Sequence, residues 1–150
     1  MFLDKIILIY SNAYIFLPVL IFLLLASYFD IKYRKIPNKL NLLFFIIRFA
    51  MIPLVGFSAS NIYGFLFGFF IILIPAMIVC KPMGGDIKAM AVLGLYLELL
   101  GIFVLLVGTI IVSLMYFFFE KIRGRKKVEI PFAPFFLISF IAIFIFVLFY

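Results

Sequence analysis

The chain has 150 residues, of which 69% are hydrophobic and 13% charged, and its formal net charge is +7 at pH 7. A soluble domain of this length cannot bury so much apolar surface in one core, so the composition excludes an ordinary soluble protein and indicates a membrane protein. The absence of His and the presence of one cysteine, Cys80, exclude a Ser–His or Cys–His catalytic pair, a CxxC zinc site and an internal disulfide.

The first apolar run, about residues 6–29, is long enough to cross the bilayer as one helix. It is too long for the apolar part of a signal peptide, so we expect it to be retained. A basic loop at 30–41 follows, and then a shorter apolar run at 42–55 that contains Arg48. None of these runs alternates strictly between polar and apolar residues, which favours helices over a membrane barrel.

A third span is expected at 62–79, between a short loop at 56–61 and a second basic loop at 80–88. The next apolar run, 89–119, is long for one helix and has basic residues at both ends. Because positive residues favour the cytoplasmic side, both ends should lie there, and this requires a turn at 98–101. The turn leaves a short fourth segment, about 89–98, of about 15 Å, which cannot cross a 30 Å core.

With a last span at 132–149, the prediction is an all-α membrane protein, a polytopic bundle of six transmembrane segments forming a single domain over 1–150. Both termini are expected outside and most basic residues in the cytoplasm. Since the positive charges lie in short clusters between apolar runs, we interpret them as topology signals and contacts to the lipid bilayer, not as a nucleic-acid-binding surface.

Two of the six carboxylates stand apart from the rest. Asp30 and Asp86 each lie where an apolar run meets a cytoplasmic loop, where a carboxylate is costly and is usually paired, wet or functional. Each aspartate could therefore cap a helix or pair with a nearby lysine, or it could be catalytic. The other four are interpreted as surface or turn residues: Asp4, Glu98, Glu120 and Glu129.

The loops around these aspartates carry glycine and proline. Gly84 and Gly85 predict a tight turn without side chains before Asp86, where an extended peptide could approach the backbone. Pro37 with Asn38 stiffens the first basic loop, and two prolines stiffen the last one, Pro131 and Pro134.

Taken in order, three stretches resemble the prepilin peptidase family, the membrane aspartic proteases that process type IV prepilins and archaeal preflagellins. They are DIKYRKIPNKLN at 30–41, MGGDIK at 83–88 and IPFAPF at 130–135. Three features depart from the family pattern: Met83 replaces the first Gly of GxGD, Ala133 replaces a Gly of the last segment, and Arg48 lies inside a span. The chain has no room for the cysteine-rich N-methyltransferase insert, so it is similar to the short, peptidase-only form.

The resemblance implies that Asp30 and Asp86 form a catalytic pair that activates water at the cytoplasmic face, with no metal and no other cofactor. It implies supporting roles for a group of loop residues: Gly84, Gly85, Lys88, Pro37, Asn38 and Pro131. It also implies a prepilin-like or preflagellin-like substrate with a short basic leader, a Gly before the cut and an apolar helix after it.

Two other classes of function stay open on the residues themselves. A small ion-coupled or proton-coupled transporter or channel could use the same two aspartates to bind a cation or relay protons. A catalytically silent scaffold for pilus or secretion assembly could keep the fold without the chemistry.

Overall fold

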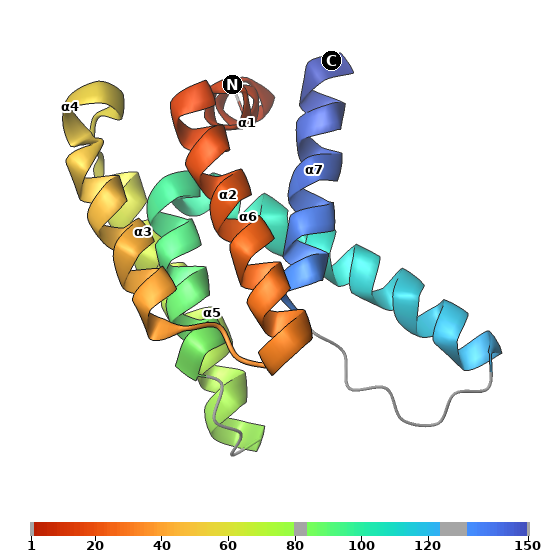
Figure 1. Cartoon of the computed structure of the whole chain (residues 1–150). Helices are drawn as coiled ribbons and strands as arrows, with labels where there is room; N and C mark the ends of the chain where they lie inside the picture. Colours follow the sequence, from red (N-terminus) through yellow and green to blue (C-terminus); the bar gives the residue numbers. More distant parts are fainter. Residues whose placement is uncertain (1, 80–83, 124–131, 150) are drawn as a thin grey trace.

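The computed structural model describes residues 2–79, 84–123 and 132–149, and every regular element in these ranges is an α-helix. Three helices are long and apolar enough to cross a membrane, namely α2 (Ala13–Tyr33), α5 (Ala59–Val79) and α6 (Gly84–Ile122). The others are α1 (Phe2–Ser11), α3 (Asn38–Ala50), α4 (Ile52–Val55) and α7 (Ala133–Phe149). In Figure 1, α2, α3, α5, the two arms of α6 and α7 run alternately down and up.

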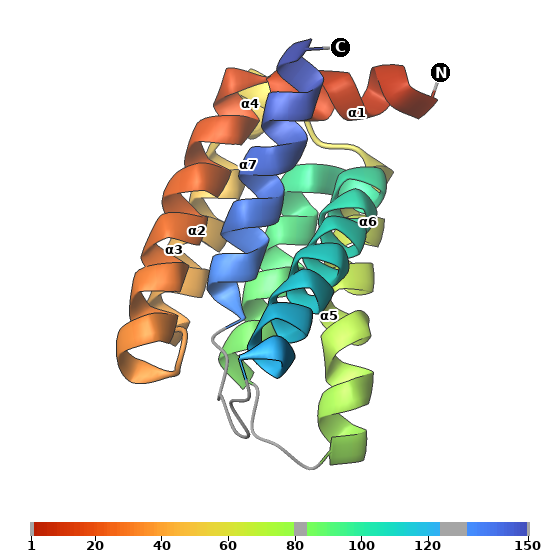
Figure 2. The ribbon, with the colours of Figure 1, turned by 90° about the vertical axis from the view of Figure 1, so that its right-hand side faces the viewer.

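The first apolar run is two helices and not the single span predicted at 6–29. α1 ends at Ser11, and Asn12 takes an extended conformation before α2. The Asn12 Oδ1 accepts a hydrogen bond of 3.0 Å from the Tyr14 N–H, which satisfies one of the free donors at the start of α2. α1 lies across the end of the bundle (Figure 2), so the segment that runs along the bundle is 13–33.

The predicted basic loop at 30–41 is shorter in the structure, because helices extend into it from both sides. α2 continues through Asp30 and ends at Tyr33, and the next residue, Arg34, has a left-handed backbone with φ of 54°. α3 begins directly after Pro37, whose fixed φ and missing N–H suit the residue before a helix. The second apolar run, predicted at 42–55, is therefore α3 followed by the single turn of α4.

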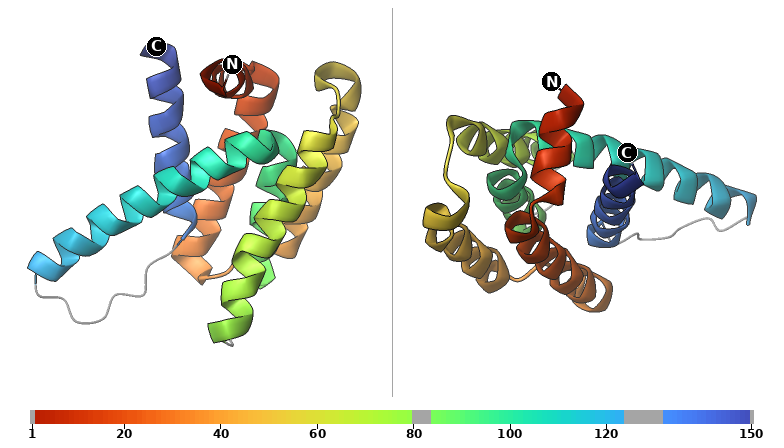
Figure 3. Two further views of the ribbon diagram at one scale, coloured as in Figure 1. Left: turned by 180° about the vertical axis from the view of Figure 1, so that it is seen from behind. Right: turned by 90° about the horizontal axis from the view of Figure 1, so that it is seen from above.

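α6 is bent into two arms at Glu98, where φ is 60° and ψ is −179°. This break falls at the first residue of the turn that the basic clusters predicted. Both arms descend from the break toward the same end of the bundle (Figures 1 and 3). The first arm covers 84–97, about 21 Å at 1.5 Å per residue, and is longer than the predicted 89–98 because Gly84, Gly85 and Asp86 are helical.

Glycines bring α5 and the first arm of α6 into backbone contact. A Cβ atom on Gly64 would collide with the Gly94 carbonyl oxygen and would lie 2.6 Å from the Glu98 carbonyl carbon. A Cβ atom on Gly68 would collide with the carbonyl oxygen of Met90, one turn before Gly94. Small residues four apart allow helices to pack this closely in lipid, where close contact replaces the hydrophobic effect as the source of association.

Arg48 lies beside the break in α6 and is only 2% exposed. Its Nε donates a hydrogen bond of 3.1 Å to the Leu95 carbonyl oxygen, and Nη2 donates one of 3.1 Å to that of Gly56. Asn61 Nδ2 donates a further bond of 2.9 Å to the Leu95 oxygen. The last carbonyl groups of a helix have no hydrogen-bond donor within it. Arg48, the charge inside an apolar run, therefore supplies a donor to the end of the first arm of α6.

Candidate active site

Asp30 joins α2 to the beginning of α7. Its side chain is buried, at 7% exposure, although it lies in the last turn of α2 beside the basic loop. The Oδ2 atom accepts a hydrogen bond of 2.9 Å from the N–H of Ala133, the first residue of α7. The first N–H groups of a helix have no acceptor within it, so the Asp30 carboxylate caps α7.

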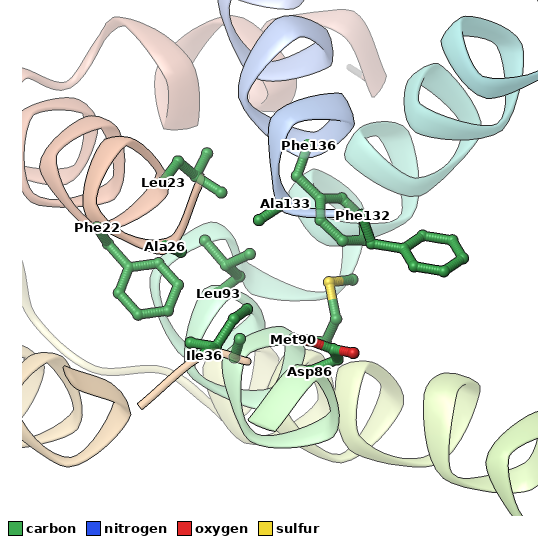
Figure 4. A pocket seen from close by; sticks show the side chains of 11 residues that line it. Phe22, Leu23, Ala26, Ile36, Asp86, Met90, Leu93, Phe132, Ala133 and Phe136 are labelled. Carbon is green, nitrogen blue, oxygen red and sulfur yellow. The ribbon is translucent and has the colours of Figure 1, made fainter. Parts of the chain in front are cut away.

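Asp86 lies in the first turn of α6 and is half-buried. It lines a cavity of about 10 Å³, together with Met90 of the same helix, Phe132 and Ala133. Figure 4 shows Asp86 and Met90 on one side of this space and Ala133 on the other, with the ring of Phe132 turned away from it. A cavity of this volume has room for about one water molecule.

The two aspartates therefore meet at one residue of α7. Asp30 is hydrogen-bonded to the Ala133 N–H, while Asp86 lines a cavity that Ala133 also lines. The Asp86 carboxyl is within electrostatic range of the Asp30 charge. A carboxyl group beside a space for one water, with a second carboxyl group nearby, can supply a base and an acid to the same reaction.

Gly85 allows the start of α6 to pack closely against the connection between α2 and α3. A Cβ atom on Gly85 would lie 2.6 Å from the Ile36 carbonyl oxygen, whereas one on Gly84 would meet nothing within 4 Å. The turn predicted at this point is wrong, since both glycines are helical; glycine is required at 85 for close approach and not for backbone conformation.

The remaining predicted residues divide into three groups. Lys88 and Asn38 are joined by a hydrogen bond of 3.1 Å between Nζ and Oδ1, which links the first arm of α6 to the start of α3. Pro37 immediately precedes α3 and is not among the residues that line the two cavities beside Asp86. Pro131 lies outside the described residues, as does Met83.

Asn41 belongs to this site, although sequence reasoning gave it no role. Its side chain is 3% exposed, and Nδ2 donates a hydrogen bond of 3.0 Å to the Gly85 carbonyl oxygen. The sequence does contain a signal for this role, because Asn41 is a polar side chain at the edge of an apolar run. A polar side chain in that position needs a hydrogen-bond partner. Asn41 fixes the residue immediately before Asp86.

A second cavity, of about 220 Å³, opens beside Asp86 at the end of the bundle. Gly84 and Gly85 form part of its wall, and its charged lining includes Arg34, Lys35 and Lys88. Asp86 is therefore next to basic side chains at this end of the bundle.

Alanine substitutions at the two glycines should affect stability differently. Gly85→Ala is expected to destabilise the protein by about 1–3 kcal/mol, because its Cβ must displace the Ile36 backbone. Gly84→Ala, in open space, is expected to be neutral or to stabilise by up to about 1 kcal/mol through helix propensity. Thermal unfolding in detergent measures both, and equal shifts in the two variants would contradict the close approach at Gly85.

A family model described as the type IV leader peptidase family matches residues 17–118, which include both Asp30 and Asp86. No curated protein and no solved structure matches the chain.

Proposed function

The chain belongs to the type IV leader peptidase family, and from this we propose that it is an aspartic endopeptidase whose catalytic pair is Asp30 and Asp86. Family membership makes it a type IV leader peptidase-like protease, and its apolar helices make it a multi-pass membrane protein. The observation that carries the assignment of the pair is that Asp30 is hydrogen-bonded to the Ala133 N–H, while Asp86 and Ala133 line the same cavity for about one water molecule.

The proposed reaction is hydrolysis of one peptide bond. One carboxylate takes a proton from the water, whose oxygen adds to the scissile carbonyl carbon. The other carboxyl group, in its protonated form, gives its proton to the departing amine as the C–N bond breaks. The two groups share one proton between them, so they act as a unit and neither has a fixed role.

We propose that the substrate is a prepilin-like or preflagellin-like protein cut between a short basic leader and an apolar helix. The glycine before the cut is proposed from the resemblance to the family. The basic lining of the second cavity supports a cytoplasmic active site, since positive residues favour that side.

A cytoplasmic active site also fixes the proposed topology of the whole chain. Alternating directions of α2, α3, α5, the two α6 arms and α7 support six membrane segments with both termini outside. This arrangement puts both aspartates at one end of the bundle. A transport site would be expected near the midplane, so the positions of Asp30 and Asp86 favour proteolysis over transport.

The purified protein should cleave a membrane-anchored peptide made of a basic leader, a glycine and an apolar helix, with mass spectrometry locating the cut after the glycine. Chelators should leave the rate unchanged, because the proposed chemistry uses carboxyl groups alone. A substrate with valine in place of the glycine is the matched control and should resist cleavage. Loss of activity with a chelator, restored by added zinc, would point to a metal protease instead.

A further inference from the structure

An apolar groove lies between α3, α5 and the first arm of α6, with a volume of about 410 Å³. Leu42 and Phe45 of α3 and Phe65 and Phe69 of α5 form its walls, and Ala91 and Val92 of α6 line its base. Leu42 is 59% exposed, so the groove opens toward the surroundings of the bundle. In a membrane this surface faces lipid or another apolar helix.

The lining of the apolar groove includes a residue with an unsatisfied hydrogen-bond acceptor. Asn41 lines the groove and is 3% exposed, and its Oδ1 has no hydrogen-bond partner in the described part of the chain. The orientation of the amide is fixed, because Nδ2 already donates to the Gly85 carbonyl. A buried acceptor without a donor costs about 1–3 kcal/mol, so a ligand with an N–H group would gain by binding here.

The apolar groove adjoins the candidate active site through shared lining residues. Asn38 and Lys88 line both the groove and the second cavity, and that cavity is also lined by Asp86. Asn41 is itself bonded to Gly85, the residue before Asp86. A chain that lay in the groove would therefore reach Asp86 at its polar end.

We propose that the apolar groove is the docking surface for the apolar helix of the substrate, and that Asn41 Oδ1 accepts a backbone N–H at the beginning of that helix. This inference rests on the proposed protease function. The first four N–H groups of any helix lack acceptors within it, and an asparagine side chain is among the best acceptors for them. A helix that starts just after the cut brings these donors to Asn41 and its apolar side chains to the phenylalanines.

The test compares two neighbouring leucines of α3. Leu42 and Leu43 are 59% and 52% exposed, but only Leu42 lines the groove. A photoreactive benzoyl-phenylalanine is placed at either position in the full chain carrying Asp86→Asn, and the protein is reconstituted with the leader–glycine–helix peptide. We expect the peptide to cross-link about tenfold more at 42 than at 43. Equal cross-linking at the two positions, or cross-links to phospholipid alone at position 42, would overturn the proposal that the groove docks the substrate helix.

Kinetics provide an independent readout. Leu42→Trp should fill the groove and raise KM about tenfold with kcat unchanged, whereas Leu43→Trp should leave both unchanged. The hydrogen bond is tested with peptides in which one backbone N–H of the first turn after the cut is replaced by an ester oxygen. At one of these positions KM should rise by up to about tenfold; no effect at any of them would refute the role of Asn41.

These results separate the two proposals. If the parent protein cleaves the peptide but Leu42→Trp and Leu43→Trp behave alike, the docking surface is wrong and the protease assignment stands. If the parent protein does not cleave, the proposed function fails, and the groove proposal fails with it.

Discussion

Replacing either Asp30 or Asp86 by asparagine should lower the rate of leader cleavage by at least about a thousandfold, because each carboxyl group is needed as acid or base. Asparagine keeps the size of the side chain and removes its charge and acid–base chemistry. In Asp30→Asn the remaining carbonyl oxygen can still accept the Ala133 N–H, so the cap of α7 is preserved. Loss of cleavage in this variant would therefore report on chemistry and not on the fold.

A double variant tests whether the two carboxyl groups act together. The double variant should be no slower than either single variant, since groups that act together give non-additive losses. Asp4→Asn, in α1, removes a carboxylate outside the candidate site and should keep the parent rate. Purified Asp30→Asn or Asp86→Asn that processes the peptide at nearly the parent rate would show that the catalytic pair is assigned wrongly.

The parts of the fold that the sequence predicted are those encoded by composition and charge. The length of apolar runs predicted an all-α membrane protein, and basic clusters at both ends of one run predicted the break in α6. The three motifs predicted the family, which the family model confirms. The first two signals lie within one stretch or its immediate flanks, and the third is a set of short motifs whose order can be read directly from the sequence.

The parts that the sequence did not predict depend on contacts between distant segments. Asp30 is a cap for α7 only because Ala133 is brought to it by the fold. Gly85 was expected to form a turn, but its requirement for glycine comes from the Ile36 carbonyl on another segment. Asn41 acquires a role through Gly85 in the same way. Local patterns describe a residue's own helix and carry no information on which backbone will lie opposite.

Arg48 is the clearest example of a residue whose meaning is set by the fold. Read along the sequence, it is a charge inside an apolar run, which is costly in a membrane. In the structure it lies at the end of the first arm of α6, where the helix dipole is negative and the Leu95 carbonyl needs a donor. The rings of Phe57 and Tyr96 lie within 6 Å of its guanidinium carbon, at 5.7 and 5.9 Å.

Arg48→Met is accordingly expected to destabilise the protein by about 3 kcal/mol, because the Gly56 carbonyl loses its charged donor and the Leu95 carbonyl keeps only Asn61. In thermal unfolding in detergent this corresponds to a fall in Tm on the order of 5–10 °C. Arg48→Lys, which keeps the charge but replaces the forked donor with a single ammonium, should lie between the parent and Arg48→Met.

The matched control is Lys39→Met, which removes the same charge from an exposed position on the same helix and should change Tm little. Arg48→Met should also slow cleavage, since the arm that Arg48 holds at one end carries Asp86 at the other, and a shift of about 1 Å at a reacting group can cost a hundredfold. If Arg48→Met unfolds at the same temperature as Lys39→Met, the carbonyl contacts do not stabilise the break in α6. The position of Asp86 must then be fixed by the contacts at its own end, those of Gly85 with Ile36 and Asn41.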